Sequence, residues 1–383
     1  MPHAPQLLAD LCSLPTAAFR EEAVYAYVEA WAKRRKRVTV EVDEVGNRLL
    51  TLAGKDKKLP RLVLVAHTDH PAFVAMEQDG PNVRAEFRGG VLAKNAEGAT
   101  VRFFCDGEPC GKASDLKVGK GERLEAATFC VPRGKTVPKG TVGMFDFGGR
   151  YPRVKKNLFE ARACDDLAGV ASALAALEVV GRKKLEASAC VLLTRAEEVG
   201  FIGAIAAAKD KRGLLRKDDR IISIETSSAQ PAAPIGGGCV LRIGDKTSVF
   251  HSGLSYFINA RGEALEKEHD GFKFRRALMP GGTCEGTAFD AFGYTAAAVC
   301  VPLGNYHNMD RDKITMGPEQ IDLGDWNNLV TLLADLAATH HEFDGKQGQL
   351  RDRLADRFAA HDHLFKDATL SLDKPTHKRG REF

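Results

Sequence analysis

Four apolar segments of the chain each lead into side chains that can bind metal ions. The segments LVLVA, CVLLT, IISI and AAAVCVPL are followed, respectively, by His67, by Glu197 and Glu198, by Glu225 and by His307. In an open α/β sheet, ligands bind outside the carboxyl ends of the strands. The pattern therefore predicts that these imidazoles and carboxylates meet at one edge of a sheet.

Two further acids, Asp165 and Asp166, stand at the start of an apolar segment that ends at Gly181 and is expected to form a buried helix. One carboxylate at a helix start is an ordinary cap. Two in succession, entering an apolar helix, need a counter-charge. Imidazoles combined with carboxylates are the ligands of zinc, cobalt or manganese rather than of a thiolate structural site.

Charge favours two divalent cations over one. Three carboxylates and one bridging hydroxide neutralise two such cations, whereas one cation leaves a surplus buried carboxylate that would have to protonate. Two cations about 3.5–4 Å apart need a carboxylate between them, and Asp165 is the expected bridge. We expect His67 and Glu225 to bind one cation, and His307 and Glu198 to bind the other.

Two acids beside the expected ligands have other roles. Glu197 would take a proton from the metal-bound water and pass it to the leaving amine. Asp69 would accept the second imidazole N–H of His67 and fix its tautomer. Taken singly, a strand-end histidine or an acidic helix start has an ordinary structural explanation. The agreement of several such groups at one edge favours a metal site.

The elements that must position these groups alternate between strand and helix, which predicts an α/β fold with a mostly parallel central sheet and helices on both faces. Residues 16–34, with Thr16 as cap, and 318–343 are expected helices. Short strands between 73 and 155 predict a small inserted all-β domain. The expected domains are a discontinuous catalytic domain (1–72 and 156–344), the insertion (73–155) and a helical, polar tail (345–383).

Composition excludes several classes of protein. With 55 basic and 51 acidic residues among 383, the net charge is only +4, so neither nucleic acid nor a membrane surface is an expected partner. Nine scattered cysteines without a CxxC pair predict reduced thiols and a cytoplasmic location. We expect no signal peptide and no membrane span.

At its chemical residues the chain resembles the dinuclear-metal aminopeptidases of the glutamyl-aminopeptidase type, which include the tetrahedral cytosolic aminopeptidases. The matching segments are AHTDHPAFVAM, RACDDLAGV, TRAEEVGFIGA, GGTCEGTAF and PLGNYHNM. The resemblance implies hydrolysis of N-terminal residues, two zinc or cobalt ions, a large homo-oligomer and a cis peptide after the bridging Asp165. It also places Gly282, Thr283 and Glu285 near the substrate.

The chain departs from the family pattern at several positions. Glu225 stands where the family usually has Asp, and His70 where it has Glu. Cys284-Glu285 replaces Asp-Ala, so the preferred N-terminal residue stays open. Glu285 is expected either to bind a substrate ammonium or basic side chain, or to face outward.

The sequence thus predicts a metal-dependent aminopeptidase acting on short peptides by attack of a metal-bridging hydroxide. Three alternatives remain open. A deacylase or carboxypeptidase would use the same chemistry on another amide. A non-catalytic scaffold would carry a decayed site. A glycan hydrolase would use paired carboxylates without the two histidines.

Overall fold

The structure, a computed structural model, describes residues 4–210 and 213–367. It consists of two compact units, Met1–His341 and Glu342–Phe383. Of the expected tail, residues 368–383 lie outside the described residues. The domain boundaries expected from the sequence stay predictions.

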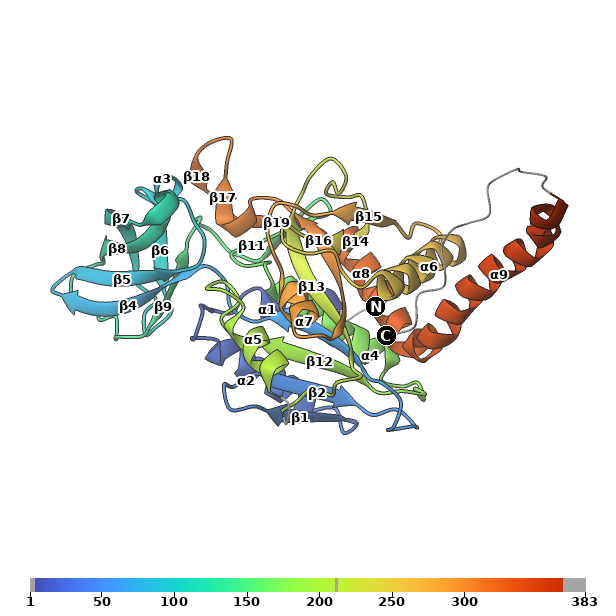
Figure 1. The fold of residues 1–383 in the computed structure, drawn as a ribbon. Coiled ribbons are helices and arrows are strands. Elements are labelled where there is room, and N and C mark those ends of the chain that lie inside the picture. Colours follow the sequence, from blue (N-terminus) through green and yellow to red (C-terminus); the bar gives the residue numbers. More distant parts are fainter. Residues whose placement is uncertain (1–3, 211–212, 368–383) are drawn as a thin grey trace, which may run out of the picture. The chain divides into compact units, whose positions relative to one another are not determined.

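The first unit is built on an eight-stranded sheet (Figure 1). The four strands in its middle are parallel to one another, and strands beside them run antiparallel to their inner neighbours. The fold is therefore mixed α/β with a mostly parallel central sheet, as predicted. In spatial order the strands are β1 (Val38–Val42), β2 (Arg48–Leu52), β12 (Ala189–Thr194), β3 (Leu62–His67), β13 (Arg220–Ser228), β16 (Thr295–Leu303), β14 (Cys239–Gly244) and β15 (Phe274–Leu278).

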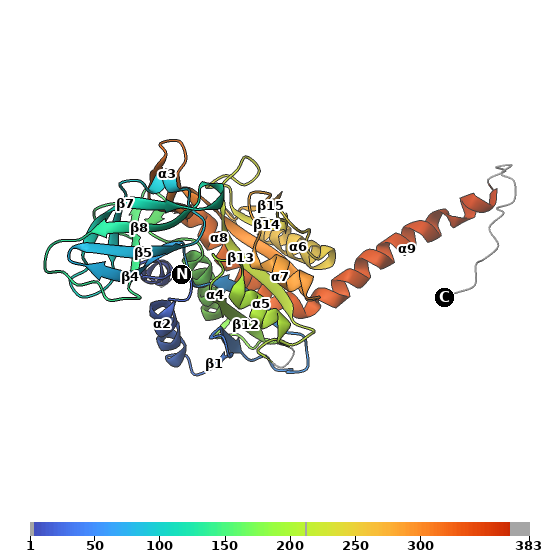
Figure 2. The same ribbon diagram turned by 60° about the vertical axis from the view of Figure 1, so that its left-hand side comes forward.

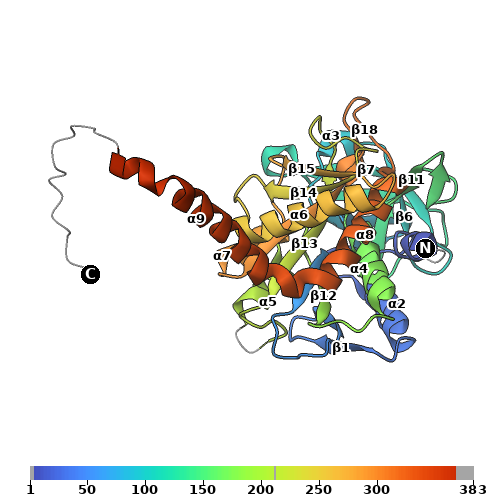
Figure 3. The ribbon, with the colours of Figure 1, turned by 90° about the vertical axis from the view of Figure 1, so that its right-hand side faces the viewer.

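Helices pack on both faces of this sheet (Figure 3). On one face lie α4 (Leu167–Val180) and α8 (Leu323–Thr339), joined by a hydrogen bond from the Trp326 indole to the Ala168 carbonyl. On the other face, α5 (Ile202–Lys209) and α7 (Glu285–Ala291) share a buried cluster with Val63 and Val65 of β3. Three further helices of this unit are α1 (Ala4–Leu11), α2 (Glu22–Lys33) and α6 (Ser252–Glu268), and α6 packs against α8.

A separate antiparallel barrel follows β3 in the chain (Figure 2). Its core is aromatic: the ring of Phe73 packs edge-on against those of Phe87 and Phe129, with centroids 4.8 Å apart in both pairs. One turn of helix, α3 (Ala93–Ala96), joins two of its strands. The strands, in spatial order, are β4 (Ala72–Asp79), β5 (Asn82–Arg88), β8 (Leu124–Cys130), β7 (Cys110–Val118), β6 (Thr100–Phe103) and β9 (Val142–Phe145).

Two expected helices begin later than predicted. Within 318–343, β19 (Glu319–Asp322) is a strand that pairs with β11 (Leu158–Ala161), and the helix α8 starts only after it. β11 also pairs with β10 (Arg153–Lys155), and a hairpin of β17 (Met309–Asp310) and β18 (Thr315–Met316) precedes β19.

Within 16–34, the helix α2 starts at Glu22. Thr16 does not cap it, because the Thr16 hydroxyl donates to the carbonyl of Thr68. In the second unit, α9 (Phe343–Asp367) is a single helix that exposes Leu354 and Leu364. Among the described residues, no helix has the length and apolarity needed to cross a membrane.

Candidate metal centre

The side chains expected at one sheet edge do lie together, because parallel strands end side by side. In the register of β3 and β12, His67 lies opposite Thr194, which places Glu197 and Glu198 just beyond the same edge. Glu225 lies within β13 next to β3. His67 and Glu225 are 1% and 7% exposed, so these two groups are largely removed from bulk water.

Asp165 lies between the two imidazoles. Its Oδ1 is 3.4 Å from Nε2 of His67, and its Oδ2 is 3.6 Å from Nε2 of His307. Nε2 of His307 also lies 3.3 Å from Oε2 of Glu198. The Thr226 hydroxyl donates to Oδ1 of Asp165 over 3.0 Å. Each oxygen of this carboxylate thus faces a different imidazole, the arrangement that a bridging ligand requires.

The other nitrogen of each imidazole faces a main-chain carbonyl. Nδ1 of His67 is 3.1 Å from the Asp69 carbonyl oxygen, and Nδ1 of His307 is 2.8 Å from that of Gly90. When Nδ1 carries the hydrogen, the lone pair of Nε2 is free to bind a cation. Gly90 follows β5, so the barrel supplies the partner of one of the expected ligands.

The carboxylate of Asp69 lies further from His67 than its own carbonyl does, with Oδ1 3.6 Å from Nδ1. Its hydrogen bonds instead come from the main chain of the acid pair: Glu197 N–H donates to Oδ1 over 2.9 Å and Glu198 N–H donates to Oδ2 over 3.1 Å. Asp69 therefore holds the Glu197-Glu198 turn against the end of β3.

Ligand atoms of the predicted set converge closely enough to hold cations. His67, Glu197 and Glu225 each offer one atom within 4.8 Å of the others, and His67, Asp165 and Glu198 form a second such group. Glu197, which was expected to act only as a proton carrier, therefore lies at ligand distance as well.

Buried carboxylate oxygens without hydrogen-bond partners show that this site fits cations. Among the described residues, Oε1 of Glu198, Oε1 of Glu225 and both oxygens of Asp166 have no partner. An unpaired buried carboxylate is costly unless it protonates or binds a cation. Burial raises the pKa of Glu225 to about 8. Burial also favours neutral Asp165, but His307 and His67 outweigh it and hold its pKa below the usual range.

The imidazoles respond in the opposite direction. Burial disfavours protonated His67 and His307, but nearby carboxylates, foremost Glu197 and Glu198 respectively, outweigh burial and raise the pKa of both rings. In the absence of metal, protons on these imidazoles and carboxylates thus supply the positive charge that cations would otherwise supply. The donor set of two imidazoles and several carboxylates suits divalent zinc or cobalt.

Two positions important to this geometry were not assigned a role from the sequence. Glu319 was placed inside an expected helix, and His70 was noted only as a departure from the family pattern. The side chain of Glu319 accepts main-chain hydrogen bonds from both Asp165 and His307, and His70 contacts the Asp165 carbonyl. The peptide bond between Asp165 and Asp166 is cis, as the resemblance implied.

A pocket of about 160 Å³ opens beside Glu225. Gly282 and Thr283, two expected substrate-binding residues, line it together with the buried Arg242. Glu285, the third, does not line this pocket and is fully buried at the start of α7, which contradicts the outward-facing alternative. Burial raises its pKa to about 7.

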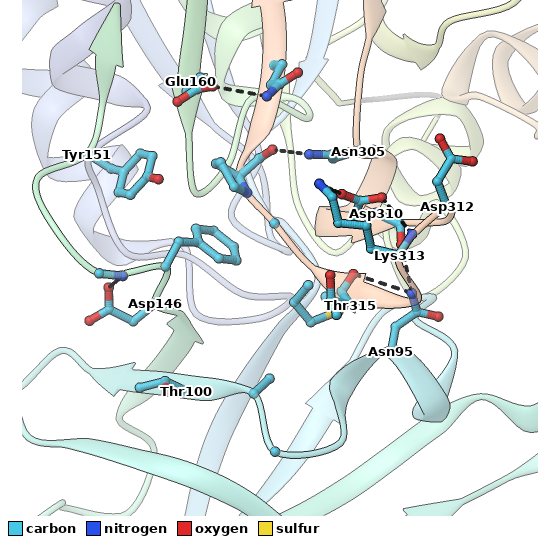
Figure 4. Close-up of a pocket in the computed structure, with 18 of the residues that line it drawn as sticks. Asn95, Thr100, Asp146, Tyr151, Glu160, Asn305, Asp310, Asp312, Lys313 and Thr315 are labelled. Carbon is cyan, nitrogen blue, oxygen red and sulfur yellow. Dashed lines mark hydrogen bonds and ion pairs between the residues drawn. The ribbon is translucent and has the colours of Figure 1, made fainter.

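A larger cavity of about 1020 Å³ is lined by Asn305 and Asp310, among others (Figure 4). The barrel lines it through Asn95 and Thr100, and the segment before β19 lines it through Pro318. Asn305 donates to the Pro318 carbonyl over 2.8 Å at its wall. None of the expected ligands lines this cavity.

Comparison with known proteins agrees with this site. Residues 135–315 match the model of the M42 glutamyl aminopeptidase family. This span includes Asp165, Glu198, Glu225 and His307, whereas His67 precedes it. No curated protein matches the sequence.

Solved structures share the fold over most of the chain. An aminopeptidase from Desulfurococcus kamchatkensis matches with a TM-score of 0.70 and 20% identity, over 88% of this chain and 95% of that one. The TET1 peptidase of Pyrococcus horikoshii is described as assembling into a tetrahedron or an octahedral shell. It matches with a TM-score of 0.69 and 19% identity, over 87% of this chain and 99% of that one. A Thermotoga maritima protein described as an endoglucanase matches with a TM-score of 0.63 and 17% identity, over 88% of this chain and 98% of that one.

The family match and the shared fold support a hydrolase of the peptidase class. More particularly, residues 135–315 are similar to the M42 glutamyl aminopeptidases, which confirms the resemblance predicted from the sequence.

Proposed function

We propose that the chain is a dinuclear metallo-aminopeptidase that removes N-terminal residues from short peptides. The observation that carries this proposal is the position of Asp165, which presents one carboxylate oxygen to each of two buried imidazoles. The proposal extends to a homo-oligomer, because similar structures are described as a dodecamer and as closed shells. It also extends to the cytoplasm, in keeping with nine cysteines that are all free.

The proposed roles follow the sequence prediction. His67 and Glu225 would hold one cation, His307 and Glu198 the other, and Asp165 both. Two divalent cations would supply a Lewis acid for the scissile carbonyl and a water that is nucleophilic at neutral pH.

Glu197 would move the proton. Burial raises the pKa of Glu197 in the metal-free chain well above that of an ordinary glutamate. With cations bound, this carboxylate would accept a proton from the attacking water and release it to the more basic amine. Its main-chain N–H is fixed by Asp69, which aims the side chain while the proton is transferred.

The side chain of the N-terminal residue would occupy the 160 Å³ pocket. Arg242 lines it, is 3% exposed, and donates to the Ser227 hydroxyl over 3.0 Å. Among the described residues, Nε of this guanidinium has no hydrogen-bond partner. A buried guanidinium with an unpartnered Nε favours an anionic occupant, and guanidinium binds carboxylates in a two-pronged geometry. Acidic N-terminal residues are therefore the preferred substrates.

Glu197→Gln tests the mechanism. We expect a loss of about 10²–10⁴-fold in kcat on aminoacyl-anilides with metal content unchanged, because the amide cannot accept the proton. Glu186→Gln, an exposed glutamate paired with Lys55, is the control and should keep full activity. Full activity of Glu197→Gln, or faster turnover of N-acyl amino acids than of aminoacyl-anilides, contradicts the proposal. The second result favours a deacylase or carboxypeptidase.

A glycan hydrolase is the second candidate, because one similar structure is described as an endoglucanase. Paired carboxylates can hydrolyse glycosidic bonds without either histidine. Cleavage of a β-glucan that persists in the presence of a chelator would favour this candidate, whereas chelator-sensitive release of N-terminal residues would exclude it.

A further inference from the structure

Two side chains outside the proposed ligand set tie Asp165 to the turn that carries His307. Glu319 is the first. Its Oε2 accepts the main-chain N–H groups of Cys164 and Asp165 over 2.7 and 3.0 Å, and its Oε1 accepts that of His307 over 2.9 Å. One fully buried carboxylate thus joins the main chain of the expected bridge to that of an expected imidazole ligand.

His70 makes the second tie. Its Nδ1 is 2.6 Å from the Asp165 carbonyl oxygen, and its Nε2 is 3.0 Å from Oδ1 of Asn308. Asn308 also donates from Nδ2 to the Arg162 carbonyl over 2.8 Å. Asp165 is therefore held at its N–H by Glu319 and at its carbonyl by His70, and both side chains also contact the turn at 307–308.

The two histidines of the site differ in how their main chain is held. His67 ends β3, whose neighbours β12 and β13 pair with it on both sides. His307 lies in a turn after β16 with φ of 55°, and Asn308 follows with φ of 61°. Residues with a side chain rarely adopt this left-handed conformation and persist in it only when surrounding contacts enforce it. Glu319 makes such a contact to His307, and His70 makes one to Asn308.

We propose that Glu319 and His70 are positioning residues that set the separation of Asp165 and His307, and that breaking either tie weakens selectively the cation held by His307 and Glu198. The proposal rests on the proposed dinuclear site. The cation held by His67 and Glu225 shares the bridge Asp165 but otherwise depends on the paired strands, so it loses less affinity.

Glu319→Gln tests this inference in the full chain. Glutamine keeps one carbonyl oxygen and turns an NH₂ group toward main-chain N–H donors, so at least one tie is lost. Calorimetric titration of the metal-free protein with Zn²⁺ should show two binding steps for the unchanged chain. In Glu319→Gln one step should persist and the other weaken by about 10- to 100-fold, the usual effect of losing a group that orients a ligand. His307→Ala identifies the weakened step, because it removes the same one.

A matched control and a second variant complete the experiment. Glu160→Gln changes another buried glutamate, on β11 beside β19, which bonds to Gln320 over 3.0 Å and touches none of the proposed ligands. It should bind both cations as the unchanged chain does. If Glu319→Gln fails to fold, His70→Phe removes the other tie at similar volume and should weaken the same step.

Three results overturn the inference: unchanged affinities in Glu319→Gln and His70→Phe, equal weakening of both steps, or fewer than two steps in the unchanged chain. Peptide hydrolysis is measured separately. Two cations with selective weakening but no release of N-terminal residues would contradict the proposed function and leave this inference standing.

Discussion

The central sheet and the barrel bury their residues in different ways. Every residue of β3 and of β12 is buried, because helices cover both faces of the parallel strands. β5 and β6 alternate between buried and less buried positions, because only one face of a barrel strand meets the core. Four of the five proposed ligands come from the sheet and its adjoining loops, and Asp165 comes from the segment between β11 and α4. The barrel reaches the ligands through the Gly90 carbonyl.

The difference follows from strand direction. Parallel strands bring their carboxyl ends to one edge, so residues distant in the sequence gather there. Antiparallel strands present their ends alternately and collect no such set. The sheet thus supplies side chains to the site, and the barrel supplies a fixed main-chain acceptor.

Asp165→Asn should have the largest effect of the variants considered, because it changes the side chain that joins the two halves of the site. The amide removes the charge between the two imidazoles, so we expect peptidase activity below detection and fewer than two bound cations by elemental analysis. Asp322→Asn is the control, because Asp322 caps α8 and asparagine caps almost as well. Two bound cations and normal turnover in Asp165→Asn would rule out the bridging role.

Phe73→Ala tests whether the barrel matters beyond its own stability. Loss of this ring from the aromatic core should lower the free energy of unfolding by about 3–5 kcal/mol in a denaturant titration. Metal affinity should fall in parallel, since a loosened barrel no longer fixes Gly90 against His307. Phe292→Ala, at a side chain 47% exposed, should change stability by less than about 0.5 kcal/mol. Unchanged metal affinity in Phe73→Ala would separate the barrel from the site.

The metal-free protein should lose stability as pH rises from about 5 to 8. Burial raises the pKa of Glu225 to about 8 and of Glu285 to about 7, so in this range the folded chain binds more protons than the unfolded chain. The free energy of unfolding is therefore highest below the pKa that these carboxyl groups have in the unfolded chain. It falls as the pH rises through their pKa values in the folded chain. Melting temperatures of chelated protein measure this fall, and Glu225→Gln should reduce it. A melting temperature that rises between pH 5 and 8 would contradict the raised pKa values of Glu225 and Glu285.

The smallest effect is expected for Gly90→Ala. A Cβ there would lie 3.6 Å from Nδ1 of His307, an ordinary contact, and the carbonyl would stay in place. Activity and stability should therefore change little. Gly89→Ala is the contrasting variant, because Gly89 has a φ of +134° and its Cβ would lie 2.7 Å from Pro71. If Gly90→Ala lowers the melting temperature more than Gly89→Ala does, the expectation that Gly90 matters only through its carbonyl is wrong.

Sequence patterns could predict the sheet and its edge, because the strands that carry the ligands are continuous apolar runs ending in unmistakable polar residues. They could not predict β19, since 319–322 reads as the start of the helix that follows and becomes a strand only by pairing with residues 158–161. The role of Glu319 was hidden for the same reason. Gly90 acts through its carbonyl, which leaves no trace in residue type.

The burial of helix α4 affects how the molecule responds to heat. Of its fourteen residues only Glu178 and Val179 are not buried, so the segment that begins next to Asp165 has almost no surface of its own. An element enclosed on all sides cannot fray ahead of its surroundings. Heat should therefore inactivate the enzyme only at temperatures where the whole first unit melts, with no earlier phase in which catalysis is gone and the fold persists.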